Sequence, residues 1–300
     1  MKILSLSTSV WAKGSLVLLL AIFILVGMWC TAVSPKSSQT ESVYHQSEWN
    51  EYAPQIDRAL SAESNVQPTG LAHVYGMVVS HHIPTTIPRL VEFYSRLKQG
   101  QTVNNFIVIG PDHTDAGQAP ITVSNASFFT AYGEVKPIEG LASKLEAENV
   151  AHIEEKPFDP EHSVGSQILV ISKIFPGARV TPIILRSDTP KDYAEALGRT
   201  LSEYLDDNTV LIASVDFSHY LSTGQAMPID EISGSIVRDL NLSSLSLAKA
   251  DSPSSLATFI EAMIQKNAID VGDFIVLNTN DLMQNSDFTT GYIFGYWGKK

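Results

Sequence analysis

Four short apolar runs along the chain end in polar residues with chemically versatile side chains. The runs are "VYGMVV", "FIVI", "VTPIIL" and "VLIAS", and such nearly uninterrupted apolar stretches are typical of buried parallel strands. Between them lie segments with apolar residues three and four positions apart, "TIPRLVEFYSRLKQ", "SVGSQILVISKIF" and "DYAEALGRTLSEYL". This spacing is helical, so the alternation predicts an α/β domain.

Histidines and carboxylates follow these runs where the predicted strands end. His81 and His82 follow the first run, His113 follows the second, and Asp216 and His219 follow the fourth. In open α/β sheets, ligands bind beyond the carboxyl ends of the strands. Three of the four runs therefore place a histidine at the edge where sites are built. Neutral imidazoles beside carboxylates are what a transition-metal or proton-transfer site requires.

Each of these residues also has a simpler structural explanation. His81 and His82 could end a strand at the solvent, and neighbours in sequence point in different directions, so at most one is expected to face a site. The segment 216–219 could begin a helix, because Asp is a favoured N-cap residue. The triplet Glu161-His162-Ser163 could do the same, with Ser163 as the cap.

The amino-acid composition limits the partners and the metal ligands that this chain can have. The chain has 300 residues, 44% of them hydrophobic and 17% charged, which is typical of a folded globular protein. A net charge of -12 argues against nucleic acid as a partner. Cys30 is the single cysteine, so a metal site would have to use His, Asp and Glu. There is no zinc-protease signature, phosphate loop or Gly-x-Ser-x-Gly motif. We interpret His45, His73 and His152 as structural.

The N-terminal region predicts a membrane anchor over residues 1–34. Residues 15–33 are nineteen positions without a charge, which predicts a membrane helix, and lysines precede them. The expected location is a single-pass membrane protein with a cytoplasmic N-terminus and the globular domain outside the cytoplasm. A cleaved signal peptide is the alternative, although Trp29 stands where a lipoprotein signal has a small residue.

A polar tether is expected over residues 35–70, followed by one domain over 71–300. Within the tether, only "SEWNEYAPQIDRALSAE" has a pattern that could form a short amphipathic helix. No later linker is long or polar enough to mark a second boundary.

The order of motifs resembles the Memo family, which includes the B component of the AmmeMemoRadiSam system. The resemblance is carried by "SHHIP", "GPDHT", "EHSVGSQ", "SVDFSHY" and "TTGYIFGYW" and spans residues 71–297. It implies a single α/β domain with a central mixed, largely parallel sheet flanked by helices, similar to class III extradiol dioxygenases. Those enzymes bind non-haem Fe(II) with two histidines and a carboxylate.

The resemblance also implies roles for individual residues. His81 and His113 match the first two metal ligands, and His219 matches the base, with Asp216 at an acidic position. The third family ligand is a Cys, and ungapped comparison places Asp251 there, which would restore two histidines and one carboxylate. A helix N-cap is the alternative for Asp251.

We expect four further residues to support the metal or contact a substrate: His82, Asp112, Glu161 and His162. The expected cofactor is a divalent metal, Fe(II) ahead of copper or zinc, and the small-molecule substrate is not specified by the sequence. The resulting hypothesis is an extradiol-type oxidoreductase. The alternatives are a metal-binding protein without turnover, a metal-dependent hydrolase, and a surface adaptor whose histidines have no chemical role.

Overall fold

The four apolar runs form the parallel middle of one sheet. The computed structural model describes residues 44–46, 48–63, 66–284 and 287–300. The four strands lie in the order β2 (His73–Val79), β9 (Thr209–Ser214), β3 (Asn105–Pro111) and β8 (Arg179–Leu185). All three neighbouring pairs are parallel. They are almost entirely buried, which explains why their sequences do not alternate between apolar and polar residues.

Antiparallel strands extend this centre on both sides. Next to β2 lies β12 (Thr289–Lys299), which also pairs with β10 (His219–Leu221) and β11 (Asp270–Asn278). Beyond β8 come β4 (Ile121–Val123), antiparallel to it, and β7 (His152–Ile153). The described residues thus form a nine-stranded mixed sheet. The predicted α/β domain with a mixed central sheet is confirmed.

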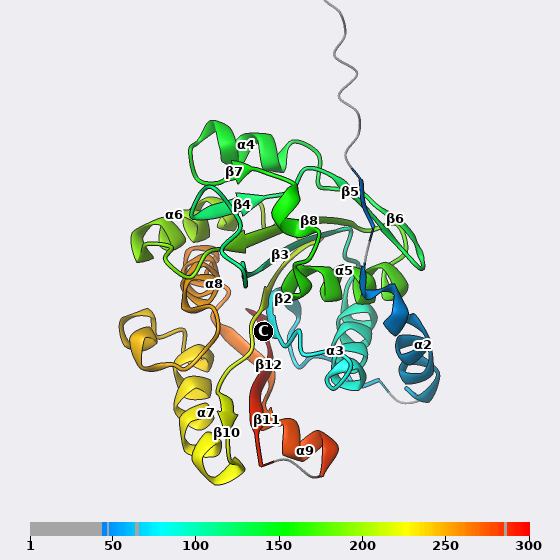
Figure 1. The fold of residues 1–300 in the computed structure, drawn as a ribbon, viewed down its shortest axis with the longest axis vertical. Coiled ribbons are helices and arrows are strands. Elements are labelled where there is room, and N and C mark those ends of the chain that lie inside the picture. The colour runs from blue at the N-terminus through cyan, green and yellow to red at the C-terminus, as the bar shows by residue number, and fades with distance from the viewer. Residues whose placement is uncertain (1–43, 47, 64–65, 285–286) are drawn as a thin grey trace, which may run out of the picture. The chain divides into compact units, whose positions relative to one another are not determined.

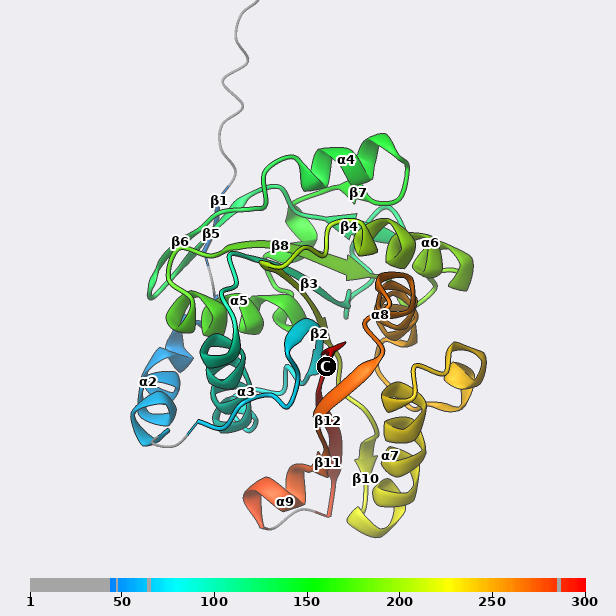
Figure 2. The ribbon, with the colours of Figure 1, turned by 180° about the vertical axis from the view of Figure 1, so that it is seen from behind.

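Helices cover both faces of the sheet (Figures 1 and 2). On one face, the helices and the sheet form a hydrophobic core that includes Leu90, Phe93 and Ile168. On the other face, they form a second core that includes Leu201 and Phe259. The first face carries α3 (Ile87–Gly100) and α5 (His162–Ile174), and the second carries α6 (Lys191–Ser202), α7 (Thr223–Arg238) and α8 (Pro253–Lys266).

The remaining helices and strands are shorter and surround the central sheet and its helices. They are β1 (Tyr44–Gln46), η1 (Glu48–Tyr52), α2 (Ala53–Ala62), β5 (Ser127–Thr130), β6 (Gly133–Val135), α4 (Leu141–Ala147), η2 (Lys156–Phe158), η3 (Leu242–Leu247) and α9 (Thr279–Met283), where η denotes a 3-10 helix.

The structure differs from the predicted tether, because the segment from residue 44 onward is folded onto the domain. Strand β1 pairs in parallel with β5, and α2 packs beside α3. Ile56 is completely buried, and the Tyr132 hydroxyl donates to the carbonyl of Ala53 at 2.8 Å. The amphipathic pattern of this segment therefore supplies an apolar face to the core, and the folded unit begins before residue 71.

His45 in β1 is enclosed by acidic residues of the domain. It is buried, its ring nitrogens lie 2.7 Å from Asp159 Oδ1 and 2.9 Å from Glu155 Oε2, and its ring stacks on Phe128. Burial alone would lower the pKa of His45, but the hydrogen bonds and charges of these carboxylates outweigh burial and raise it. These contacts join β1 to the domain, and protonation of His45 strengthens them.

We therefore expect the contribution of His45 to stability to decline with rising pH. A raised folded-state pKa means that this contribution is fully present below the unfolded value of 6.5 and is lost as the pH rises through the folded value. The Tm difference between the parent chain and His45→Gln should accordingly be larger at about pH 6 than at about pH 9. A difference that grows with pH would contradict this assignment.

The predicted membrane helix over residues 15–34 lies outside the described residues. Within the part of the chain that is described, no helix has both the length and the apolar character needed to cross a membrane. On this finding we withdraw the predicted single-pass location, with its cytoplasmic N-terminus and external domain, and the membrane as a partner.

Candidate metal centre

His81 lies at the carboxyl edge of the sheet, two residues after β2. It is only 2% exposed, and its Nε2 is 3.1 Å from Asp251 Oδ2 and 3.7 Å from Asp216 Oδ2. Its backbone N–H donates to Asp216 Oδ1 at 3.3 Å. Burial opposes protonation, but the charges of Asp216 and Asp251 prevail and raise the pKa of His81 to about 9. The surroundings of this ring thus favour a positive charge, whether a proton or a metal ion.

His113 follows β3 and is held by Glu161. Its Nδ1 lies 2.8 Å from Glu161 Oε1, and its backbone N–H donates to Glu161 Oε2, also at 2.8 Å. Its Nε2 is left facing Asp251, 3.9 Å from Oδ2. A carboxylate on one ring nitrogen fixes the tautomer that leaves the other nitrogen free for a metal. Asp112 keeps the turn in place by accepting from the N–H groups of Ala116 and Gly117.

Glu161 also begins helix α5. Its side chain accepts from the N–H of Ser163 at 2.7 Å, so Glu161 is the N-cap and the prediction of Ser163 as the cap is wrong. The Ser163 hydroxyl instead donates to the carbonyl of Pro111 at 2.9 Å, which joins α5 to the end of β3. Burial raises the pKa of Glu161, but its hydrogen bond to His113 and the charge of that ring lower it to about 2 overall.

Asp251 is not a helix cap. The N-cap of α8 is Ser252, whose hydroxyl accepts from the N–H of Ser255 at 3.2 Å. Asp251 is instead tied to Asp216: its Oδ2 accepts from the N–H of Asp216 at 3.2 Å, and its own N–H donates to the carbonyl of Asp216 at 2.9 Å. Its Oδ1 is buried and has no hydrogen-bond partner among the described residues. A buried carboxylate oxygen without a donor is suited to a cation.

His162, the first residue of α5, joins the two predicted histidine ligands. Its ring stacks on His113 with centroids 4.1 Å apart and meets His81 edge-on at 5.1 Å. Ligand atoms lie within 4.8 Å of one another in two groups, one of His81, His113 and His162 and one of His81, Asp216 and Asp251. Burial, followed by the charges of the other two rings, lowers the pKa of His162 to about 4. It is therefore a neutral imidazole with ligand capacity, although the sequence indicated only a supporting role.

His82 and His219 lie outside both groups. The His82 Nδ1 is 2.6 Å from the Tyr292 hydroxyl. Burial lowers the pKa of His82, the charge of Asp216 opposes this shift, and the charges of His81 and His219 reinforce it. His219 is half-buried in β10, on the far side of β12 from β2. Residues 215–218 form no helix, and α7 begins only after Ser222, so the helix-cap explanation for Asp216 is wrong.

If His113 binds a metal, Glu161 should control the affinity. We expect Glu161→Gln to raise the metal Kd by about 10-fold and Glu161→Ala by about 100-fold, the usual range for an outer carboxylate that orients a histidine ligand. Gln retains one acceptor for the ring, whereas Ala retains none. Competition titration against a chelator measures the change. Glu154→Gln is the control, because Glu154 binds Gln118 outside the site. Equal affinities in all four proteins would exclude His113 as a ligand.

A family profile and two curated proteins that are similar to this chain carry related descriptions. A family profile described as "Memo-like protein" matches residues 42–278. A MEMO1 family protein of Caldivirga maquilingensis is 34% identical over 120 residues, which are 38% of this chain and 42% of that protein. Another, from Sulfurisphaera tokodaii, is 29% identical over 154 residues, 50% of this chain and 48% of that protein. The matches thus span less than half the length of these curated relatives.

An uncharacterized protein of Escherichia coli K12 aligns with 74% of this chain and 99% of its own, at 11% identity and a TM-score of 0.46.

Proposed function

The chain belongs to the Memo family, and from this premise we propose that it is a metal-binding protein whose ion is held by His81, His113 and Asp251. The observation that carries the proposal is the buried, unpaired Oδ1 of Asp251 beside two histidines whose Nε2 atoms face the same carboxylate. Two imidazoles and a carboxylate suit Fe(II), with zinc as a competitor, and this set of three donors contains no thiolate, which disfavours Cu(I). His162 offers a further nitrogen at the same place.

We extend the proposal to a non-haem Fe(II)-dependent oxidoreductase of the extradiol type. When bound, Fe(II) would supply the redox chemistry. The chain would supply orientation and proton transfer: Glu161 fixes the His113 ring, Asp216 fixes the backbone of His81, and His219 moves a proton of the substrate. A half-buried imidazole outside the ligand groups is suited to that role because it need not release the metal when it changes protonation state.

The first alternative is a protein that binds iron or copper without turnover. It needs the same ligands but not His219. His219→Ala separates the two functions, because only the oxidoreductase would lose activity while retaining its metal. A metal-dependent hydrolase is the second alternative, and it would function with zinc in the absence of O2.

The test is metal analysis of the full chain purified without oxygen. We expect about one equivalent of iron per chain, mostly reduced, and its loss in His81→Ala. His152→Ala is the matched control, because this exposed histidine pairs with Glu146 away from the site. A chain that binds neither iron, zinc nor copper would refute the proposal in all its forms.

A further inference from the structure

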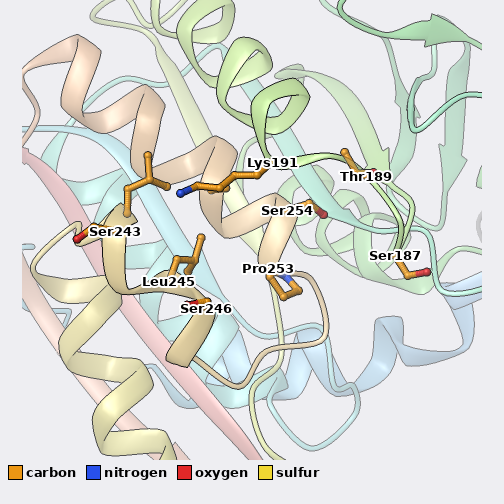
Figure 3. Close-up of a pocket in the computed structure, with 10 residues that line it drawn as sticks. Ser187, Thr189, Lys191, Ser243, Leu245, Ser246, Pro253 and Ser254 are labelled. Atoms are coloured by element: carbon orange, nitrogen blue, oxygen red, sulfur yellow. The ribbon is translucent and has the colours of Figure 1, made fainter.

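A second feature of the carboxyl edge is a pocket of about 250 Å³ that none of the metal-ligand candidates lines. It lies between the loop after β8, the 3-10 helix η3 and the start of α8 (Figure 3). Its size is just below the usual range for small-molecule pockets, so it suits a ligand of few atoms. The lining residues are Ser187, Thr189, Lys191, Leu242, Ser243, Leu245, Ser246, Pro253, Ser254 and Ala257.

Among the described residues, Lys191 is the one charged residue that lines this pocket. Its side chain extends from the start of α6 toward the segment that carries Ser243 (Figure 3). Its Nζ lies 3.6 Å from Glu195 Oε1, and the lysine side chain is 60% exposed. Exposed ion pairs of this kind on a helix contribute little to the stability of the fold. The ammonium group of Lys191 can therefore leave Glu195 and bind a ligand with only a small loss of free energy.

The hydroxyl groups divide into those already engaged and those available. Ser187 donates to Asp115 Oδ2 at 2.6 Å, and Ser243 donates to Asn241 Oδ1 at 2.7 Å. The Thr189 hydroxyl lies 2.7 Å from the Pro120 carbonyl. By contrast, the Ser246 hydroxyl makes no hydrogen bond to a side chain or carbonyl of the described residues, and the Ser254 hydroxyl has only a long contact of 3.4 Å to that of Ser252. Two hydroxyl donors therefore remain for a ligand that accepts hydrogen bonds.

The rest of the lining is apolar. Leu245 and Ala257 are buried beneath the pocket, and Leu242 and Pro253 complete its apolar part. Both α6 and α8 begin at the pocket, and the starts of helices carry partial positive charge. Lys191, two free hydroxyls and an apolar base thus form a surface for a molecule with one anionic end and a compact apolar body.

We propose that this pocket binds a small organic anion, with its charged group beside Lys191 and its apolar part against Leu245 and Ala257. The charged group is a carboxylate or a phosphate, since both accept from ammonium and hydroxyl donors. This site goes beyond the proposed metal function and does not depend on it, because no metal-ligand candidate lines the pocket.

The experiment is a binding titration of the full chain, freed of metal with EDTA so that an anion has no metal to bind. The probes are benzoate, phenyl phosphate and the neutral benzyl alcohol, and calorimetry or ligand-observed NMR reports Kd. We expect an anionic probe to bind more tightly than benzyl alcohol. Lys191→Met should then raise its Kd by about fivefold or more, and Lys191→Arg should change it by less than about twofold.

Two further variants complete the design. Lys136→Met is the matched control, since Lys136 is also 60% exposed and paired with a nearby glutamate but lies outside the pocket. Ser246→Phe places a bulky side chain in the pocket and should abolish binding of the anions. Binding of benzoate alone supports a carboxylate ligand, and binding of phenyl phosphate alone supports a phosphate ligand. The proposal is overturned if neither anion binds, or if Lys191→Met and Lys136→Met have equal effects.

Discussion

Asp251→Ala is expected to weaken metal binding by more than about 100-fold, beyond the roughly 10–100-fold effect of losing an outer-shell partner. Asp251 is the carboxylate that both Nε2 atoms face, at 3.1 Å from His81 and 3.9 Å from His113. Removing it leaves two of the three proposed ligands and takes away one of the two carboxylates beside His81. Competition titration with Fe(II) and Zn(II) under anaerobic conditions measures the loss.

Two other substitutions at this position separate charge from ligand type. Asp251→Asn keeps the shape but not the charge and should also bind Fe(II) weakly. Asp251→Cys should retain metal and shift the preference toward copper, because a thiolate is a softer ligand than a carboxylate. The control is Ser252→Ala, which removes the α8 cap at about 1 kcal/mol of stability and should leave metal affinity unchanged. Parent-like iron affinity in Asp251→Asn would transfer the carboxylate role to Asp216.

Gly110→Ala is expected to destabilise the folded chain by about 1–3 kcal/mol, the range for overpacking a tight core. A Cβ at this position would stand 2.7 Å from the Ser163 hydroxyl and 2.9 Å from Ser163 Cβ. Ser163 is completely buried and is held by Pro111 and Ser214, so it cannot move aside easily. Helix α5 would have to shift, and with it Glu161 at its start. Denaturant unfolding measures the stability.

The matched control for this substitution is Gly224→Ala near the start of α7. A Cβ there meets nothing within 4 Å, and alanine in a compatible backbone usually stabilises a protein by about 0.4–1 kcal/mol. Because α5 carries both Glu161 and His162, we also expect Gly110→Ala to reduce metal affinity while Gly224→Ala does not. A Gly110→Ala chain as stable as the control would show that β3 and α5 are less tightly joined than the structure indicates.

The parallel centre of the sheet could be predicted because each strand is a local apolar run. The four runs correspond to β2, β3, β8 and β9, and the three periodic segments correspond to α3, α5 and α6. The antiparallel additions could not be predicted in the same way. Strand β10 has three residues, none of them buried, so it has no apolar run to mark it. Strand β11 does contain the run "FIVL", but most of the strand is only partly buried, and nothing in this run indicates that it pairs antiparallel with β12.

The site was partly predictable for a related reason. His81, His113 and Asp216 follow strands directly, and the ends of parallel strands meet at one edge. The sequence indicated less clearly that His162 belongs to the site. His162 begins helix α5 and does not follow a strand, so its position depends on how α5 packs on the sheet. The helix caps are neighbours of the residues that the sequence suggested. Glu161, not Ser163, caps α5, and Ser252, not Asp251, caps α8. Neighbouring polar residues at a helix start have similar capping propensities, so the sequence does not distinguish them.

The position of β12 has a consequence for synthesis of the chain. This strand lies between β2 and β10 in the sheet, yet it follows all other described strands in sequence. During synthesis, one edge of β2 can pair with β9 as soon as residues 209–214 are available. The other edge of β2 has no partner until residues 289–299, which form β12, have been synthesised. An exposed apolar edge is a template for intermolecular pairing. We therefore expect the nascent chain to be vulnerable to aggregation through β2 until β12 has been synthesised, and chaperone binding near β2 would protect it during that interval.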